Sequence, residues 1–290
     1  MRTRKYLTGL AALAMMGASG TAMADDSGLE LHGFGDIALK NDYVTPRGLV
    51  VTTQGATIQV LNGLVLTTPA GINFHAGTWV DLNPGYSRAD GNITAVNEFD
   101  FFFGVDGNIA KNLNLGVEYS QFVSGQPSVA FRDERNIEFA LKYSDNPEGT
   151  LSLNPYAKFF WAFDSRSSTV VLGRQGKTFD VELGAVPTYK GKGFSLSVPT
   201  WVTVGPESYW GRGDSALTQP DGNVGVISTG LKGVVPLSFL GGAGAKASLY
   251  GQVQYYHLVN DALLRAKGVL NSGASNRDHL VFGAGLNFGF

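Results

Sequence analysis

The side chains that could do acid–base chemistry are scattered along this sequence. Glu98 and Asp100 stand two residues apart, and residues at that spacing share one face of a strand. Two close carboxyl groups could act as general acid and general base, one with a raised pKa. A pair of inward-facing acids with basic neighbours explains the same spacing, and we favour this simpler interpretation.

The four histidines, His32, His75, His257 and His279, show no spacing typical of a metal site. The chain has no cysteine, which excludes thiolate zinc sites and cysteine nucleophiles. A Ser–His–acid triad can assemble from distant segments, but nothing in the sequence indicates one. We therefore predict no catalytic residue, no metal-binding residue and no cofactor.

The stretch from Gly33 to Ala38 nearly matches a dinucleotide-binding fingerprint. Such a fingerprint requires a helix directly after the glycines, so that the helix N-terminus meets the pyrophosphate. Asn41, Asp42 and Pro46 follow instead. We interpret the glycines as positions that ease a tilted strand.

The N-terminus has the three parts of an export signal. Three basic residues lie within the first five positions, an apolar segment covers 7–18, and a small-residue cleavage site ends at Ala24. The alternative is an N-terminal anchor, but the apolar segment is shorter than the roughly 20 residues that span a bilayer as a helix. We predict a signal peptide over 1–24 and one mature domain over 25–290.

Composition narrows the class of the mature chain. Without 1–24 the basic residues fall from 22 to 19 against 24 acidic ones. This acidic balance argues against a nucleic-acid partner, which needs a basic footprint. After the signal there is no apolar stretch long enough for a membrane helix. The remaining classes are an exported globular protein and a membrane β-barrel.

The mature chain alternates large apolar residues with small or polar ones, the period of a β-strand. The end of the chain shows this best, because apolar side chains from Leu280 to Phe290 occupy every second position. A strand that ends the chain on an aromatic residue is more typical of barrels than of soluble sandwiches. The pattern predicts about twelve strands, at 29–39, 54–66, 71–82, 95–107, 113–123, 134–144, 151–163, 178–187, 193–204, 222–232, 245–257 and 277–290.

The predicted connections alternate between short and long, as in membrane barrels, which have short periplasmic turns, longer outer loops and an even strand number. We predict an all-β, transmembrane, antiparallel up-and-down β-barrel of about twelve strands, with ten and fourteen open. Three features fit badly: the long link 233–244, the lost alternation at Val226-Ile227, and prolines 155 and 199 inside proposed strands.

The polar face of these strands should point into the barrel. We predict the following lining residues by strand parity: Asp36, Asp81, Glu98, Asp100, Glu118, Glu138, Lys142, Lys158, Asp180, Glu182 and Lys246, with Lys40 and Asp106 on the same face. Acids outnumber bases nine to four in this set of thirteen. A water-filled lumen of this kind would favour cations. A lumen closed by its own side chains and ion pairs is the alternative.

Several short motifs resemble the TorF-type porin family. The matching positions are Asp42, Tyr43, Arg47 and Gly48, then Gln59, then Gly71, Gly77, Trp79 and Asp81, then Glu98, Asp100 and Gly104, and finally Asn154-Pro155-Tyr156. The resemblance covers 29–163 best. The chain departs from the family at Leu49-Val50-Val51, where a polar run is expected. The resemblance implies an outer-membrane location and a pore, and names no solute.

Three functions remain open. The first is an outer-membrane channel for passive diffusion of ions or small polar solutes, without enzymatic activity. The second is a barrel enzyme such as a lipid hydrolase, with His257 or His279 near a nucleophile. The third is a structural or adhesive barrel that binds through outer loops such as 208–213, which contains Trp210. Expected partners are membrane lipid and the barrel-assembly machinery, the latter through the last strand and Phe290.

Overall fold

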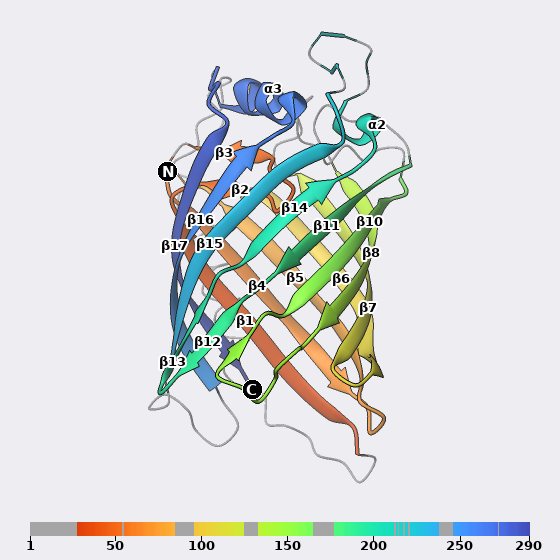
Figure 1. Cartoon of the computed structure of the whole chain (residues 1–290), viewed down its shortest axis with the longest axis vertical. Helices are drawn as coiled ribbons and strands as arrows, with labels where there is room; N and C mark the ends of the chain where they lie inside the picture. Colours follow the sequence, from red (N-terminus) through yellow and green to blue (C-terminus); the bar gives the residue numbers. More distant parts are fainter. Residues whose placement is uncertain are drawn as a thin grey trace, which may run out of the picture.

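The chain forms a closed antiparallel β-barrel with a wall of twelve strands, as predicted (Figure 1). We call each of the twelve a stave, whether it is one continuous strand or two short segments in line. The computed structural model describes residues 28–53, 55–84, 96–124, 133–164, 177–211, 213, 215–216, 218–219, 221–237, 246–271 and 273–290. The predicted signal peptide lies outside these residues. No described helix is long and apolar enough to cross a membrane.

Nine staves are single strands: β1 (Glu30–Lys40), β4 (Thr57–Thr67), β5 (Ile72–Leu82), β6 (Val96–Ala110), β7 (Leu113–Ser124), β8 (Glu134–Tyr143), β15 (Val224–Pro236), β16 (Lys246–Leu258) and β17 (Asp278–Gly289). Each of the other three is divided into two segments: β9 (Leu151–Ser152) with β10 (Pro155–Ala162), β11 (Thr178–Ala185) with β12 (Thr188–Gly191), and β13 (Phe194–Ser197) with β14 (Thr200–Val204). Strand β1 pairs with β17, where Ile37 faces Leu286, and this pairing closes the barrel.

The two ends of the barrel are built differently (Figure 1). At the turn end, short connections such as 68–71 and 111–112 join the strands, and the last strand ends there. At the loop end lie the short strands β2 (Tyr43–Val44) and β3 (Val50–Thr52), together with helices α2 (Glu207–Trp210) and α3 (Asp261–Leu270). Helix α3 begins after Asn260, whose side chain accepts a hydrogen bond from the Ala262 amide at 2.9 Å.

The outer surface is apolar because one face of each strand points away from the axis. Leu39, Phe103 and Phe282 all point outward, each with 55% of its surface exposed. The alternation expected to fail at Val226-Ile227 is in fact kept. Ile227 points outward and is 48% exposed, whereas Val226 points inward and is fully buried. The inward position is apolar because loop residues fill the barrel at that level.

The prolines that fitted badly lie where strands begin or break. Pro155 is the first residue of β10, and Pro199 lies between β13 and β14. Pro187 lies in the break between β11 and β12. Proline lacks a backbone donor and is tolerated where the ladder is interrupted. The predicted long link 233–244 is shorter than expected, because β15 continues to Pro236; residues 238–245 lie outside the described residues.

Candidate functional site: the barrel lumen and its plug

The strand register places the eleven residues expected from strand parity on the inward side of the strands, and their role in lining a pore stays a prediction. The register places Glu118 beside Gly104 and Glu138, and it places Lys158 beside Ala140 and Glu182. The eleven fall into two levels. Asp36, Glu118, Glu138, Lys142, Lys158 and Lys246 lie toward the turn end, and Asp81, Glu98, Asp100, Asp180 and Glu182 lie buried toward the loop end.

Toward the turn end the inner face is charged and partly exposed. The ring nitrogens of His75 lie 3.1 Å from Glu118 and 3.5 Å from Asp106. Lys158 lies 3.4 Å from Glu138. The carboxylate-bearing side chains of Asp106 and Glu118 are 28% and 32% exposed, so water reaches them. Charges at this depth are tolerable because they face water and one another.

Across the lumen from these acids, a second polar group lies on β1, β15 and β16. The Tyr250 hydroxyl donates to Asp36 at 3.0 Å. The Lys232 ammonium lies 4.1 Å from the centre of the Tyr250 ring, a cation–π contact. Lys232 was not in the predicted set, because the alternation of its strand was in doubt.

At the loop end, residues 41–53 fold back into the barrel and form a hairpin from β2 and β3. We call this hairpin together with α3 the plug. The hairpin turns at Thr45–Gly48, where the Gly48 amide donates to the Thr45 carbonyl at 2.9 Å. Pro46 presets the backbone of this turn, and Gly48 has a φ of +89°, which favours glycine.

Apolar packing joins the hairpin to α3 and to the wall. Val44 and Val50 pack in one cluster with Ala262 and Leu263 of α3 and with Val226 of the wall. A second cluster brings Leu49 and Val51 together with Ala266 of the helix. The Leu49-Val50-Val51 segment, which leads into β3, is therefore the buried apolar part of the plug. This explains why the chain is apolar where the resembled family is polar.

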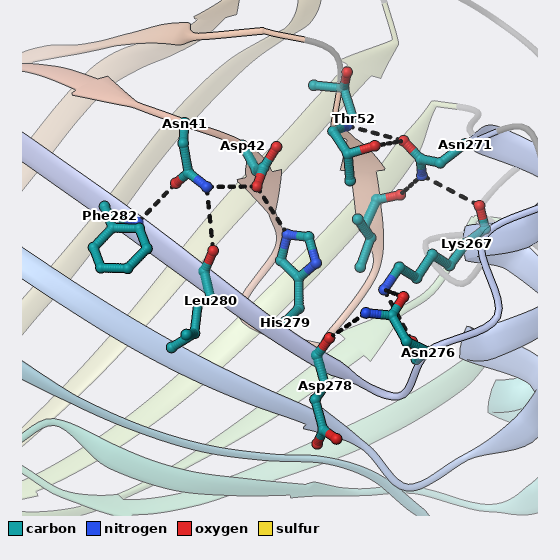
Figure 2. Close-up of polar contacts among 12 residues, drawn as sticks. Asn41, Asp42, Thr52, Lys267, Asn271, Asn276, Asp278, His279, Leu280 and Phe282 are labelled. Atoms are coloured by element: carbon teal, nitrogen blue, oxygen red, sulfur yellow. Dashed lines mark hydrogen bonds and ion pairs between the residues drawn. The ribbon is translucent and has the colours of Figure 1, made fainter.

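Polar contacts fix the base of the plug to β17 (Figure 2). The Asn41 side chain donates to the Leu280 carbonyl at 3.2 Å and accepts from the Phe282 amide at 2.7 Å. The Asp42 carboxylate lies 3.1 Å from the His279 ring nitrogen. These contacts hold the segment that leads from β1 into the hairpin against the barrel wall.

A single amide, Asn271, ties the hairpin to the end of α3 (Figure 2). Its carbonyl oxygen accepts from the Thr53 amide at 2.9 Å, and its amide nitrogen donates to the Val50 carbonyl at 3.0 Å. Lys267 of the same helix donates to both the backbone carbonyl and the side chain of Asn276, at 2.9 and 2.8 Å. Hairpin and helix therefore form one connected unit.

Tyr43 places the hairpin against the acidic wall of β5 and β6. Its hydroxyl donates to the Glu98 carboxylate, and its ring centre lies 5.3 Å from that of Trp79. Burial and the neighbouring carboxyl groups of Glu98 and Asp100 raise the pKa of the Tyr43 phenol well above its ordinary value. Tyr43 therefore stays a neutral donor. Asp81 beside it accepts hydrogen bonds from the side chains of Thr57, Gln59 and Asn97.

Arg47 at the tip of the hairpin reaches the opposite wall. Its guanidinium carbon lies 5.2 Å from the ring centre of Phe122 and 4.9 Å from that of Phe160. One of its nitrogens lies 3.8 Å from Glu134. Burial alone would lower the pKa of Arg47, but the acidic groups of Tyr209, Glu134 and Asp180 raise it above its ordinary value. The tip is further held by Trp201, whose indole donates to the Pro46 carbonyl at 2.8 Å.

The plug buries the inner face all the way round the loop end. Every stave contributes at least one inward side chain with no more than 5% of its surface exposed. These residues are Ala38, Thr57, Asp81, Glu98, Ser120, Glu134, Ala162, Asp180, Thr203, Val226, Leu258 and Val281. The lumen is therefore hydrated toward the turn end and filled at the loop end.

Sequence reasoning located the wall but missed the plug. Residues 41–53 were expected to be an outer loop, and nothing in their periodicity indicates that they fold inward. The resemblance does point to the plug. Of its matched residues, Asp42, Tyr43, Arg47 and Gly48 belong to the hairpin, and Trp79 and Glu98 contact it.

The residues assigned to the two alternative functions lie elsewhere. His257 points outward at the loop end, with Nδ1 2.8 Å from Asp278, and within the described residues no serine or threonine hydroxyl is hydrogen-bonded to it. His279 contacts Asp42 at the base of the plug. The expectation that Trp210 offers an exposed contact surface is wrong. Trp210 is fully buried and packs against Tyr209 and Val226, because α2 turns it inward.

No protein-family model and no curated protein matches the sequence. Among solved structures, the chain is similar to the NanC porin, with 9% identity over 87% of this chain and 98% of the porin and a TM-score of 0.48. It is similar to an outer-membrane channel from Pseudomonas putida F1, with 12% identity over 94% and 99% and a TM-score of 0.48. These likenesses are remote, and the fold rests on the strand pairing described above.

Proposed function

We propose that this protein is an outer-membrane channel for passive diffusion of ions and small polar solutes, and that the plug closes its outer mouth. The observation that carries the proposal is the partly exposed, charged inner face toward the turn end, where Glu118 is 32% exposed. Ionised side chains that face water inside a barrel are typical of a lumen through which polar solutes move. No cofactor and no enzymatic activity are needed for passive diffusion.

The location follows from how such barrels insert. Short turns and the C-terminus lie on the periplasmic side of outer-membrane barrels, and long loops lie outside. With that orientation the plug is at the outer mouth and the apolar outward face contacts lipid. Phe290, the last residue, exchanges backbone hydrogen bonds with Gly33 at 2.8 and 3.1 Å. We propose that this closing strand is what the barrel-assembly machinery binds, after export by the signal peptide 1–24.

A preference for cations is the finer part of the proposal. The arc from β5 to β11 carries nine inward acids but only two inward lysines, Lys142 and Lys158. The arc from β15 to β1 carries Lys232, Lys246 and Lys40. Acids therefore dominate the inner face, which lowers the energy of a cation in the lumen relative to an anion.

Conductance across a planar bilayer tests the proposal. The native protein should open rarely, and a variant whose residues 44–51 are replaced by a short Gly-Ser linker should conduct in steps several-fold more often and favour cations. A matched control replaces the exposed turn 146–149 at the other end and should behave as the native protein. A plug-shortened barrel that is folded, judged by its retained β-sheet spectrum, yet conducts no more than lipid alone would overturn the proposal.

A further inference from the structure

The guanidinium of Arg47 occupies a cage whose walls belong to other elements. Phe122 comes from β7, Glu134 from β8, Phe160 from β10 and Asp180 from β11. These four adjacent staves are joined by continuous ladders, in which Phe122 faces Glu134 and Phe160 faces Asp180. Arg47 comes from a turn in a separate hairpin. The wall of the cage and the guanidinium that occupies it therefore belong to separate elements of the fold.

The cage has the chemistry that selects a flat organic cation. Aromatic faces attract a guanidinium within about 6 Å of the ring centroid, and the two rings lie within that distance. Carboxylates match the donors of a guanidinium in geometry as well as in charge. Glu134 and Asp180 are both fully buried, so water does not compete for their oxygens.

Arg47 does not approach Glu134 as closely as a hydrogen bond requires. Its nearest nitrogen lies 3.8 Å from that carboxylate and forms no hydrogen bond within the described residues. The Asn136 side chain interacts with Glu134, and the Tyr209 hydroxyl interacts with Asp180. Aromatic and charge contacts therefore hold Arg47 in the cage, and a cation that is not tethered to the hairpin could approach Glu134 more closely.

We infer that the cage formed by Phe122, Glu134, Phe160 and Asp180 is a binding site for solutes that carry a guanidinium or a similar organic cation, and that Arg47 occupies it as an internal ligand. A solute entering from the turn end competes with Arg47, and its binding frees the tip of the hairpin. This inference rests on the proposed channel for its physiological role, whereas the binding site itself does not require conductance.

Chemical complementation tests the site. Replacing Arg47→Ala empties the cage, and methylguanidinium at low millimolar concentration should then raise the unfolding midpoint of the variant. The native protein should respond at least about tenfold more weakly, because its own guanidinium competes. Methylurea has the same shape without the charge and should have no effect. Arg135→Ala is the matched control, since Arg135 is 41% exposed and pairs with Asp164 at 3.3 Å rather than with Glu134.

The outcomes separate the binding site from the channel. Methylguanidinium binding that is lost in Arg47→Ala/Asp180→Asn supports the cage. Equal responses of Arg47→Ala and Arg135→Ala overturn it, as does an equal response to methylurea. If Arg47→Ala does not fold, Arg47→Gln keeps a polar side chain without the guanidinium and is tested in the same way. If the plug-shortened barrel conducts but Arg47→Ala binds no methylguanidinium, the binding site is overturned and the channel stands. If Arg47→Ala binds methylguanidinium but the plug-shortened barrel does not conduct, the channel is overturned and the binding site stands.

Discussion

The loop end and the turn end of the barrel share one wall but differ in what surrounds its charges. At the turn end Glu118 is partly exposed and pairs with His75 at 3.1 Å. At the loop end Asp180 is fully buried and interacts with the buried Tyr209 hydroxyl. The strands are continuous between the two levels. The difference therefore comes from the plug, and it shows that strand parity decides which face a residue takes but not whether water reaches it.

The largest loss of stability should come from a substitution of Gly48, which lies at the tip of the plug and packs against the wall. A Cβ at Gly48 would lie 2.8 Å from the Cβ of Val226, and its φ is +89°. Strain and overpacking together should make Gly48→Val destabilising by about 3 kcal/mol, measured by urea unfolding. Gly55→Ala is the control, because Gly55 also has a positive φ of +80° but nothing within 4 Å. Equal losses in the two variants would mean that the tip is not packed against the wall.

The link between hairpin and α3 should have the next largest effect. Asn271→Ala removes the acceptor of the Thr53 amide and the donor to Val50, and should cost about 1–3 kcal/mol because buried partners are left unsatisfied. The variant should also raise conductance. Asn146→Ala removes an exposed hydrogen bond to the Leu151 carbonyl at the turn end and should change neither property appreciably. Unchanged conductance in Asn271→Ala would show that the helix does not hold the hairpin.

Much of the wall could be predicted, because each strand repeats its signal every two residues. Twelve strands follow from that repetition, and so does the expectation that charged residues such as Glu138 point inward. The plug could not be predicted in this way. Its strands β2 and β3 are only two and three residues long, too short for a period to show. Arg47 reaches its partners across the barrel, and Glu134 and Asp180 lie 87 and 133 positions away in the sequence. Contacts of that kind depend on closure of the barrel.

Neutralising the partly exposed acids of the turn end should alter selectivity and leave stability nearly unchanged. Glu118→Gln with Glu138→Gln removes two negative charges from the hydrated level, so the reversal potential of plug-shortened channels should shift toward lower cation preference. The unfolding free energy should change by less than about 1 kcal/mol, because partly exposed ion pairs contribute little. An unaltered reversal potential would place these residues off the conduction path.

The smallest change in stability should come from a substitution of Asp145, in a turn far from the plug. Asp145 accepts backbone hydrogen bonds from Asn154 and Leu153, both at 2.8 Å, and these bonds lower the pKa of its carboxyl group. A lowered pKa means that the ionised form stabilises the fold at pH values above about 4, and that this contribution is lost as the pH falls through the lowered pKa. Asp145→Asn should therefore be slightly less stable than the native protein at pH 7 and equally stable in strong acid. If the difference in stability between Asp145→Asn and the native protein persists in strong acid, it comes from the changed shape of the side chain and not from its ionisation.

We expect the plug alone to separate the filled loop end from the hydrated turn end. The chain contains no cysteine, so a single introduced thiol reports its own surroundings. Ser228→Cys lies on the inner face at the buried level, and Glu118→Cys lies at the hydrated level. A charged, membrane-impermeant thiol reagent should modify Glu118→Cys more than about tenfold faster, and replacement of 44–51 should bring Ser228→Cys to a similar rate. Equal rates in the intact protein, or continued protection of Ser228→Cys without the hairpin, would contradict the claim.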